Sequence, residues 1–258
     1  MPIHDVYARL TPYELCLPEL EWARERFREV RDEALARGVD AGDPGAFLRL
    51  EAVADLLAAV RPAEEAELFP QHAILLYHAF HFWRAGEPLF LLVTPAVKRL
   101  AAPVSPPWAG GLPAAAGYVQ LPQHLLWTAE EGAPPESIDG FFWAAPGEGG
   151  ELRLLAVSGM RGDRPGFSVL PLPPLPVETL RSWPELEARE GRPDFRSRLP
   201  GAQLEGLLQV NTAGDLLGLA WRALAFLSES GAVEPETAPS VGAPPPTRLP
   251  YRRLSSQA

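Results

Sequence analysis

The chain has 258 residues, of which 47% are hydrophobic, and a formal net charge of −10 at neutral pH. This apolar content can bury a substantial core, which excludes a wholly disordered chain, and the length suits one large or two small domains. The acidic balance argues against a binder that relies on bulk positive charge, so we expect no nucleic acid as a partner.

The cysteine content and the apolar stretches limit the compartment and the chemistry. Cys16 is the only cysteine, which excludes an intramolecular disulfide, a cysteine-based zinc site and a CxxC redox motif. Residues 1–20 lack the basic start and apolar run of a signal peptide. The most apolar stretches, 73–83 and 216–227, are too short to span a bilayer. We therefore expect a cytoplasmic protein with no membrane partner.

Helical patterns fill the first hundred residues. Residues 20–37 carry one apolar stripe with positions three or four apart, formed by Leu20, Ala23, Phe27, Val30 and Ala34. Asp43-Pro44 is typical of a helix start and predicts a second helix up to Pro62, with a stripe of Phe47, Leu50, Ala54 and Leu57. Residues 71–85 are apolar almost all round and precede Gly86. This third helix should therefore lie at the centre of the helical part.

Strand patterns dominate the middle of the chain. Residues 89–93 predict a short buried strand, and Thr94-Pro95 opens a short helix up to Leu100. After a proline-rich loop, four further strands are predicted at 117–127, 138–145, 152–158 and 166–170. The short connections between these consecutive strands favour an antiparallel meander. Pro122 cannot donate a ladder hydrogen bond, so it should lie at an edge or a bulge.

The C-terminal part alternates between proline-rich and helical segments. Residues 171–176 predict a polyproline connector, 182–200 are polar and irregular, and Thr212-x-x-Asp215 opens a last helix that ends near Ser230. The tail, residues 231–258, is rich in proline and has too few apolar residues for a core of its own. Its cluster Leu249–Leu254 should anchor the tail either to a partner or to the protein's own sheet edge.

These elements together predict an α+β fold. A helical layer, residues 1–102, packs on an antiparallel β meander with a C-terminal helix, residues 103–230. The two parts are expected to form one compact domain, followed by the proline-rich tail, residues 231–258.

One set of side chains could support hydrolysis. His124, Asp139 and Ser158 lie on or beside neighbouring predicted strands and could form a triad. Ser158 stands in the sequence Ala156-Val157-Ser158-Gly159-Met160, which lacks the first glycine of a nucleophile elbow. The alternative function is therefore a small-molecule hydrolase that uses these three residues. No residue is singled out as catalytic.

Metal and cofactor motifs are absent from the sequence. His72, His78 and His81 share one predicted helix, but no pair has the i, i+4 spacing of a helical zinc site. No phosphate-cradling glycine loop, zincin motif or EF-hand loop occurs. The sequence therefore predicts neither a metal site nor a cofactor.

Large aromatic and arginine side chains are the candidates for binding. The consecutive run Phe141-Phe142-Trp143 presents rings to both faces of its strand, so the second face must be covered by another layer, a partner or a ligand. Tryptophan and arginine also dominate binding hot spots, although the same rings could simply form the core. The candidate binding residues are Trp108, Trp127, Phe142, Trp143, Tyr251, Arg252 and Arg253.

Three short motifs between Gly117 and Leu170 carry a resemblance to a known family. In chain order they are Leu121-Pro122, Ile138-x-Gly140-Phe141 with Trp143-Ala144, and the apolar run 152–157. This order resembles the central region of one family of type V-A anti-CRISPR proteins and their bacterial relatives. The resemblance implies that the chain binds another protein or its nascent chain, and it transfers no functional residue. The first functional hypothesis is accordingly a non-enzymatic protein-binding module, a regulator or an assembly component.

Overall fold

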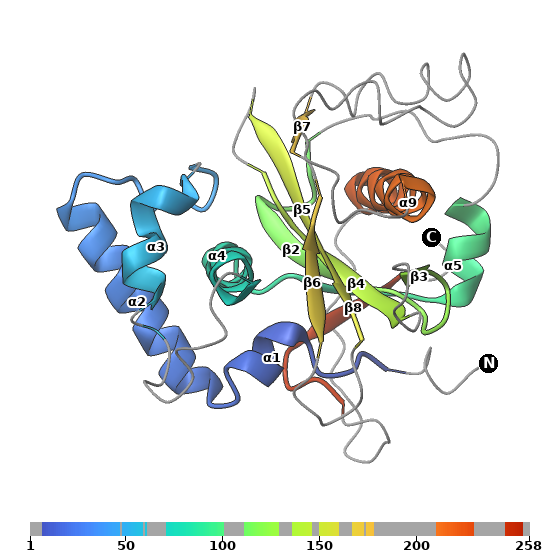
Figure 1. Ribbon diagram of the computed structural model, residues 1–258, viewed down its shortest axis with the longest axis horizontal. Coiled ribbons are helices and arrows are strands. Elements are labelled where there is room, and N and C mark those ends of the chain that lie inside the picture. The colour runs from blue at the N-terminus through green and yellow to red at the C-terminus, as the bar shows by residue number, and fades with distance from the viewer. Residues whose placement is uncertain are drawn as a thin grey trace.

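The computed structural model describes residues 7–46, 48–58, 60, 71–100, 111–128, 136–145, 150–159, 167–172, 174–177, 210–229 and 246–254. Within these ranges a mixed sheet lies between two groups of helices (Figure 1). α4 (Gln71–Arg84) covers one face, with α2 (Leu20–Ala36) and α3 (Leu50–Ala58) beyond it. α9 (Val210–Glu229) and α5 (Thr94–Leu100) lie on the other side. The predicted α+β class is confirmed.

The described strands follow the order β6-β5-β4-β2-β1-β8 across the sheet. Their bounds are β1 Leu89–Leu92, β2 Ala116–Gln120, β4 Glu136–Ala144, β5 Glu151–Ser158, β6 Ser168–Pro171 and β8 Tyr251–Leu254. Two short strands pair outside this path: β3 (Trp127–Thr128) with β4, and β7 (Leu175–Pro176) with β5.

The predicted antiparallel meander holds for only part of this sheet. β2, β4, β5 and β6 pair antiparallel, whereas β1 runs parallel to both of its neighbours, β2 and β8. The chain passes from β1 to β2 through α5, and such a helical crossover returns the chain in the same direction. The predicted meander is therefore wrong for the β1–β2 and β1–β8 pairs, because short turns join antiparallel strands.

Most predicted helices are confirmed within a few residues, but the second begins later than expected. The Oδ1 atom of Asp43 accepts a hydrogen bond from the Gly45 backbone N–H at 2.9 Å, so Asp43-Pro44-Gly45 forms a turn and α3 starts at Leu50. Its buried residues are Val53 and Leu57.

A short helix, α1 (Pro12–Cys16), was not predicted. It begins with a capping box in which the Thr11 side chain accepts from the Glu14 N–H, while the Glu14 side chain accepts from the Thr11 N–H. The box makes even this short segment helical.

One predicted strand and the predicted polyproline connector differ from the structure. The predicted strand 117–127 ends at Gln120, and Pro122 lies in the following turn, where its missing N–H costs no ladder bond. The predicted polyproline connector includes β7, which pairs with β5. The segment 182–200 and the first part of the tail, 231–245, lie outside the described residues.

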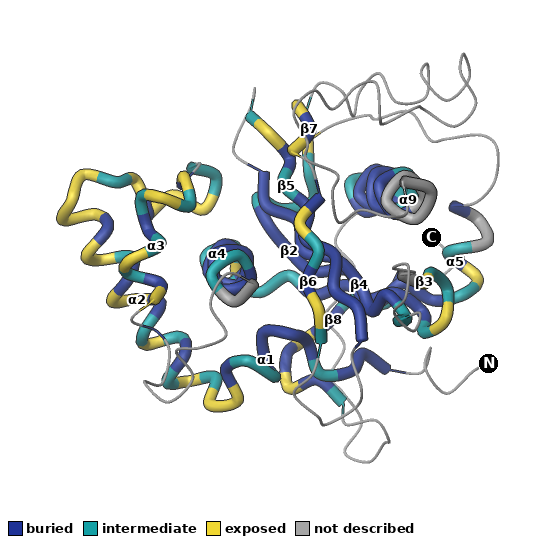
Figure 2. The backbone as a smooth tube through the Cα atoms, viewed as in Figure 1, coloured by how far each residue is buried: buried dark blue, intermediate teal, exposed yellow. Residues whose placement is uncertain are grey.

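Both faces of the central strands are buried. β1 and β2 are buried at every position, as Figure 2 shows by the dark blue of the sheet centre. The Phe142 ring lies 5.7 Å from Phe82 of α4, whereas Phe141 and Trp143, one position to either side, point to the opposite face. The second layer that the sequence required for these rings is thus formed by the chain itself.

None of the helices in the described ranges combines the length and apolar composition needed to cross a membrane.

Close backbone packing at Gly140 fixes the middle of the sheet. The β4–β5 register shifts between Ile138 and Gly140, and a Cβ atom on residue 140 would lie 2.2 Å from the Val119 carbonyl oxygen. Only glycine fits this approach, which explains its place in the Ile138-x-Gly140-Phe141 motif.

Candidate functional site

A buried ion pair holds residues 7–18, here called the N-terminal segment, on the sheet. One guanidinium nitrogen of Arg9 donates to Asp139 Oδ1 at 2.8 Å and to the Leu121 carbonyl at 2.9 Å. The side chains of Arg9 and Asp139 are 5% and 3% exposed. Tyr118 Oη donates to Asp139 Oδ2 at 2.6 Å, and burial followed by the nearby carboxylate raises the pKa of Tyr118 well above its usual value. The neutral phenol therefore remains a donor, and Asp139 accepts hydrogen bonds on both oxygens.

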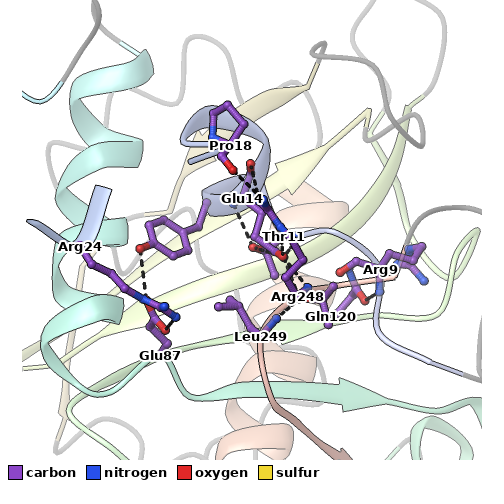
Figure 3. Close-up of polar contacts among 11 residues, drawn as sticks. Arg9, Thr11, Glu14, Pro18, Arg24, Glu87, Gln120, Arg248 and Leu249 are labelled. Carbon is purple, nitrogen blue, oxygen red and sulfur yellow. Dashed lines mark hydrogen bonds and ion pairs between the residues drawn. The ribbon is translucent and has the colours of Figure 1, made fainter. Parts of the chain in front are cut away.

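A second buried carboxylate, Glu14, joins the two ends of the described chain (Figure 3). Glu14 Oε2 accepts from the Thr11 backbone N–H, the Thr11 hydroxyl and the Thr247 hydroxyl at 2.8, 3.0 and 2.7 Å. Glu14 Oε1 accepts from the Arg248 backbone N–H at 2.7 Å. The Glu14 side chain is fully buried, so this set of donors replaces the water that the carboxylate loses.

Residues 246–254, here called the C-terminal segment, form a docked unit around this carboxylate. Arg248 donates to the Pro18 carbonyl at 2.6 Å, and the Thr247 N–H donates to the Ala8 carbonyl at 2.9 Å. β8 then adds to the sheet in parallel with β1, from the Leu89–Tyr251 pair to the Leu92–Leu254 pair. We call Ala8–Pro18 together with β1 the docking site.

Three candidate binding residues from the sequence lie in this segment. Tyr251 is buried at 2% exposure, and the Arg252 guanidinium lies 5.7 Å from the centre of the Phe90 ring. Arg253 is half-buried in the same strand. The tail was expected to anchor either to a partner or to the protein's own sheet edge. In the structure it pairs with the sheet edge, at β1.

A bidentate ion pair secures the helical layer beside the docking site (Figure 3). Arg24 of α2 donates from Nε and from one terminal nitrogen to the two Glu87 oxygens, at 2.9 and 2.5 Å. Tyr13 Oη donates to the same carboxylate at 3.1 Å, and burial followed by that negative charge raises the pKa of Tyr13. Glu87 holds a backbone φ of +57°, a strained position that these contacts stabilise.

The three residues of the hydrolytic alternative have other contacts. Asp139 accepts from Arg9, Tyr118 and Gln120, and the Ser158 hydroxyl donates to Glu136 Oε2 at 3.2 Å. The His124 ring stacks on Trp127. No described contact joins these three residues to one another, and a carboxylate neutralised by Arg9 is a poor partner for a histidine.

The remaining aromatic candidates divide between the core and the surface. The Phe142 and Trp143 side chains are fully buried, so in this fold they serve the core and offer no surface to a partner. Trp108 lies outside the described residues. Trp127 is 43% exposed and stands at the start of the β3–β4 pair.

Trp127 and His124 form an exposed aromatic pair. Their rings are stacked with centroids 5.0 Å apart and planes 17° from parallel. His124 has a backbone φ of +64°, and its N–H donates to the Ser137 hydroxyl at 2.9 Å. The hydrogen bond stabilises a conformation that histidine seldom adopts, and this conformation brings the histidine ring to the tryptophan.

Two histidines of α4 are buried. One ring nitrogen of each, His78 Nδ1 and His81 Nε2, has no hydrogen-bond partner in the described part of the chain. Burial, followed by the charge of Arg153, lowers the pKa of His78 to about 3. Burial and then the charge of Arg84 lower the pKa of His81 well below its usual value. Both rings are therefore neutral at physiological pH. Within the described ranges no three His, Cys, Asp or Glu side chains are placed to share a metal ion.

The sequence-based prediction missed Glu14, Thr247 and Arg248. A signal for the first was present, because Thr11-x-x-Glu14 is a capping-box pattern and marks a carboxylate held close to backbone. No local pattern could pair Glu14 with Thr247, which lies at the other end of the chain. That contact is a property of the folded sheet.

Comparison of the chain with models of protein families, with curated proteins and with solved structures finds no match.

Proposed function

We propose that the protein binds another protein, as a regulator or an assembly component without chemistry of its own. The observation that carries this proposal is the exposure of Trp127 on a fold whose other described large rings are buried or partly buried. Trp127 and Leu35 are the large hydrophobic side chains that are exposed among the described residues, at 43% each. Tryptophan is one of the residue types enriched in binding hot spots, which cluster near the centre of an interface.

The geometry around Trp127 supports a binding role over a merely tolerated ring. The ring is fixed by its stack on His124, and a fixed ring loses little conformational entropy when a partner covers it. The Ser137 hydroxyl stabilises the unusual backbone of His124. The resemblance to proteins that act by binding favours the same class of function.

Leu35 supplies a matched control for the experiment. The experiment is a pull-down from native lysate with tagged wild type, Trp127→Ala and Leu35→Ala, followed by quantitative mass spectrometry. We expect a stoichiometric partner with wild type and with Leu35→Ala, and at least about a tenfold loss of that partner with Trp127→Ala, since hot-spot truncations cost 2 kcal/mol or more. Equal recovery by the two variants would exclude Trp127 as the contact, and no specific partner for wild type would contradict the proposed function.

A further inference from the structure

The C-terminal segment contacts its docking site as a peptide ligand contacts a receptor. Its strand β8 pairs with β1, and the hydrogen bonds of Thr247 and Arg248 described above end on Ala8, Glu14 and Pro18. All of these receptor groups lie N-terminal to residue 93. Strand addition of this kind draws its affinity from backbone pairing and its specificity from side-chain contacts.

The side-chain contacts make the docking selective. The Thr247 hydroxyl donates to Glu14 Oε2 at 2.7 Å, and the Arg248 side chain donates to the Glu14 and Pro18 carbonyls at 3.4 and 2.6 Å. Leu249, Tyr251 and Leu254 then bury their apolar side chains to between 1% and 2% exposure. The docked segment thus contributes a hydroxyl, a guanidinium and three buried apolar side chains in fixed order along an extended chain.

The linkage of the segment to the fold permits exchange between molecules. Residues 230–245 separate it from α9 in the sequence. A chain of this length can span on the order of 50 Å when extended. Insertion into a second molecule would form the same contacts as insertion into the first, so exchange loses no docking contact.

A docking site left empty after its own segment has moved away would be costly. This cost favours the binding of an identical segment from another molecule. Without the segment Glu14 would lose its Thr247 and Arg248 donors in a buried position, and β1 would become an unpaired edge. We propose that the docking site is a peptide-recognition site and that its ligand in trans is the C-terminal segment of a second copy of this chain. The exchanged pair is a two-fold dimer in which each copy supplies β8 to the other. This inference is independent of the proposed function, because neither Trp127 nor His124 contributes to it.

A pair of complementary variants tests the exchange. Glu14→Gln alters the docking site and leaves the segment intact, whereas Thr247→Ala combined with Tyr251→Ala alters the segment and leaves the docking site intact. Neither variant alone has a matched site and segment, but a mixture contains one matched pair. We expect a 1:1 heterodimer in the mixture by native mass spectrometry, and its absence up to about 1 mM, the effective concentration of a tethered segment, would overturn the proposal. A mixture of two differently labelled segment variants is the control and should stay monomeric.

A labelled peptide of residues 246–258 supplies a second readout. The full-length segment variant is expected to bind it about tenfold more tightly than wild type, since the intact segment of wild type competes for the site. The control peptide carries Thr247→Ala and Tyr251→Ala and should bind neither protein. If the segment variant is unfolded, the peptide should restore its helical circular dichroism and the control peptide should not. Equal behaviour of the two peptides would overturn the proposal.

Discussion

Gly117 lies opposite Trp143 in the β2–β4 pair. A Cβ atom on residue 117 would lie 2.0 Å from the Trp143 ring, well inside van der Waals contact. Gly117→Ala should therefore lower the free energy of unfolding by about 1–3 kcal/mol or more in denaturant melts. Gly111→Ala is the matched control, because its Cβ would meet nothing within 4 Å and should cost less than about 0.5 kcal/mol. Equal costs would contradict the packing of β2 against Trp143.

The buried histidines predict a specific loss of stability in mild acid. The unfolded chain protonates His78 near pH 6.5, whereas burial keeps its folded pKa at about 3. The contribution of neutral His78 to the free energy of unfolding is therefore complete above pH 6.5 and is lost as the pH falls toward 3. Each pH unit in this window costs on the order of 1 kcal/mol for each such histidine. The uncharged variant His78→Leu should therefore lose less stability than wild type between about pH 7 and pH 5, and parallel losses in denaturant melts would argue against this role.

At the scale of elements, α4 connects the outer helices to the sheet. Leu76 is 3% exposed and Phe80 is fully buried. Replacing either with alanine should cost roughly 2–5 kcal/mol of unfolding free energy, as the removal of core side chains does. Leu35→Ala on the exposed face of α2 is the control and should stay within about 0.5 kcal/mol of wild type. Losses below that value at both α4 positions would show that this helix is not central.

The elements that could be predicted are those whose signal is local. The apolar periodicity of α2 and the continuous apolar run of α4 each identify a helix from a single window of sequence. Asp43-Pro44 misled the prediction because the same residues that start helices also form turns, and the Asp43 to Gly45 hydrogen bond decided for the turn.

The parts that could not be predicted depend on contacts between distant residues. The parallel place of β1 between β2 and β8 follows from the α5 crossover and from a strand more than 150 residues away, which no local pattern encodes. For the candidate site, the exposed Trp127 was among the predicted binding residues. The sequence could not distinguish it from Phe142 and Trp143, which are buried. Phe142 is buried on the face that α4 covers, and Trp143 on the opposite face, where α9 lies.

At the scale of the whole molecule, the two ends of the described chain stabilise each other. The N-terminal segment reaches the sheet through the Arg9–Asp139 pair, and the C-terminal segment reaches the N-terminal segment through Glu14. The edge strand β8 follows Thr247 and Arg248 directly in the chain, so the contacts of Glu14 and the β1–β8 pairing belong to one docked segment. Folding of this edge therefore requires residues from the beginning, the middle and the end of the sequence.

Removal of the C-terminal segment should consequently lower the stability of the whole fold. A chain truncated after Ser230 leaves the buried Glu14 without its Thr247 and Arg248 donors, and the loss of such partners costs on the order of 3 kcal/mol. For a chain of this size the melting temperature should fall by roughly 6–12 °C, measured by circular dichroism. The full-length variant Thr247→Ala should show a smaller decrease in the same direction, because it removes one hydroxyl donor and keeps β8. An unchanged melting temperature after truncation would mean that the docked segment adds nothing to the stability of the isolated protein.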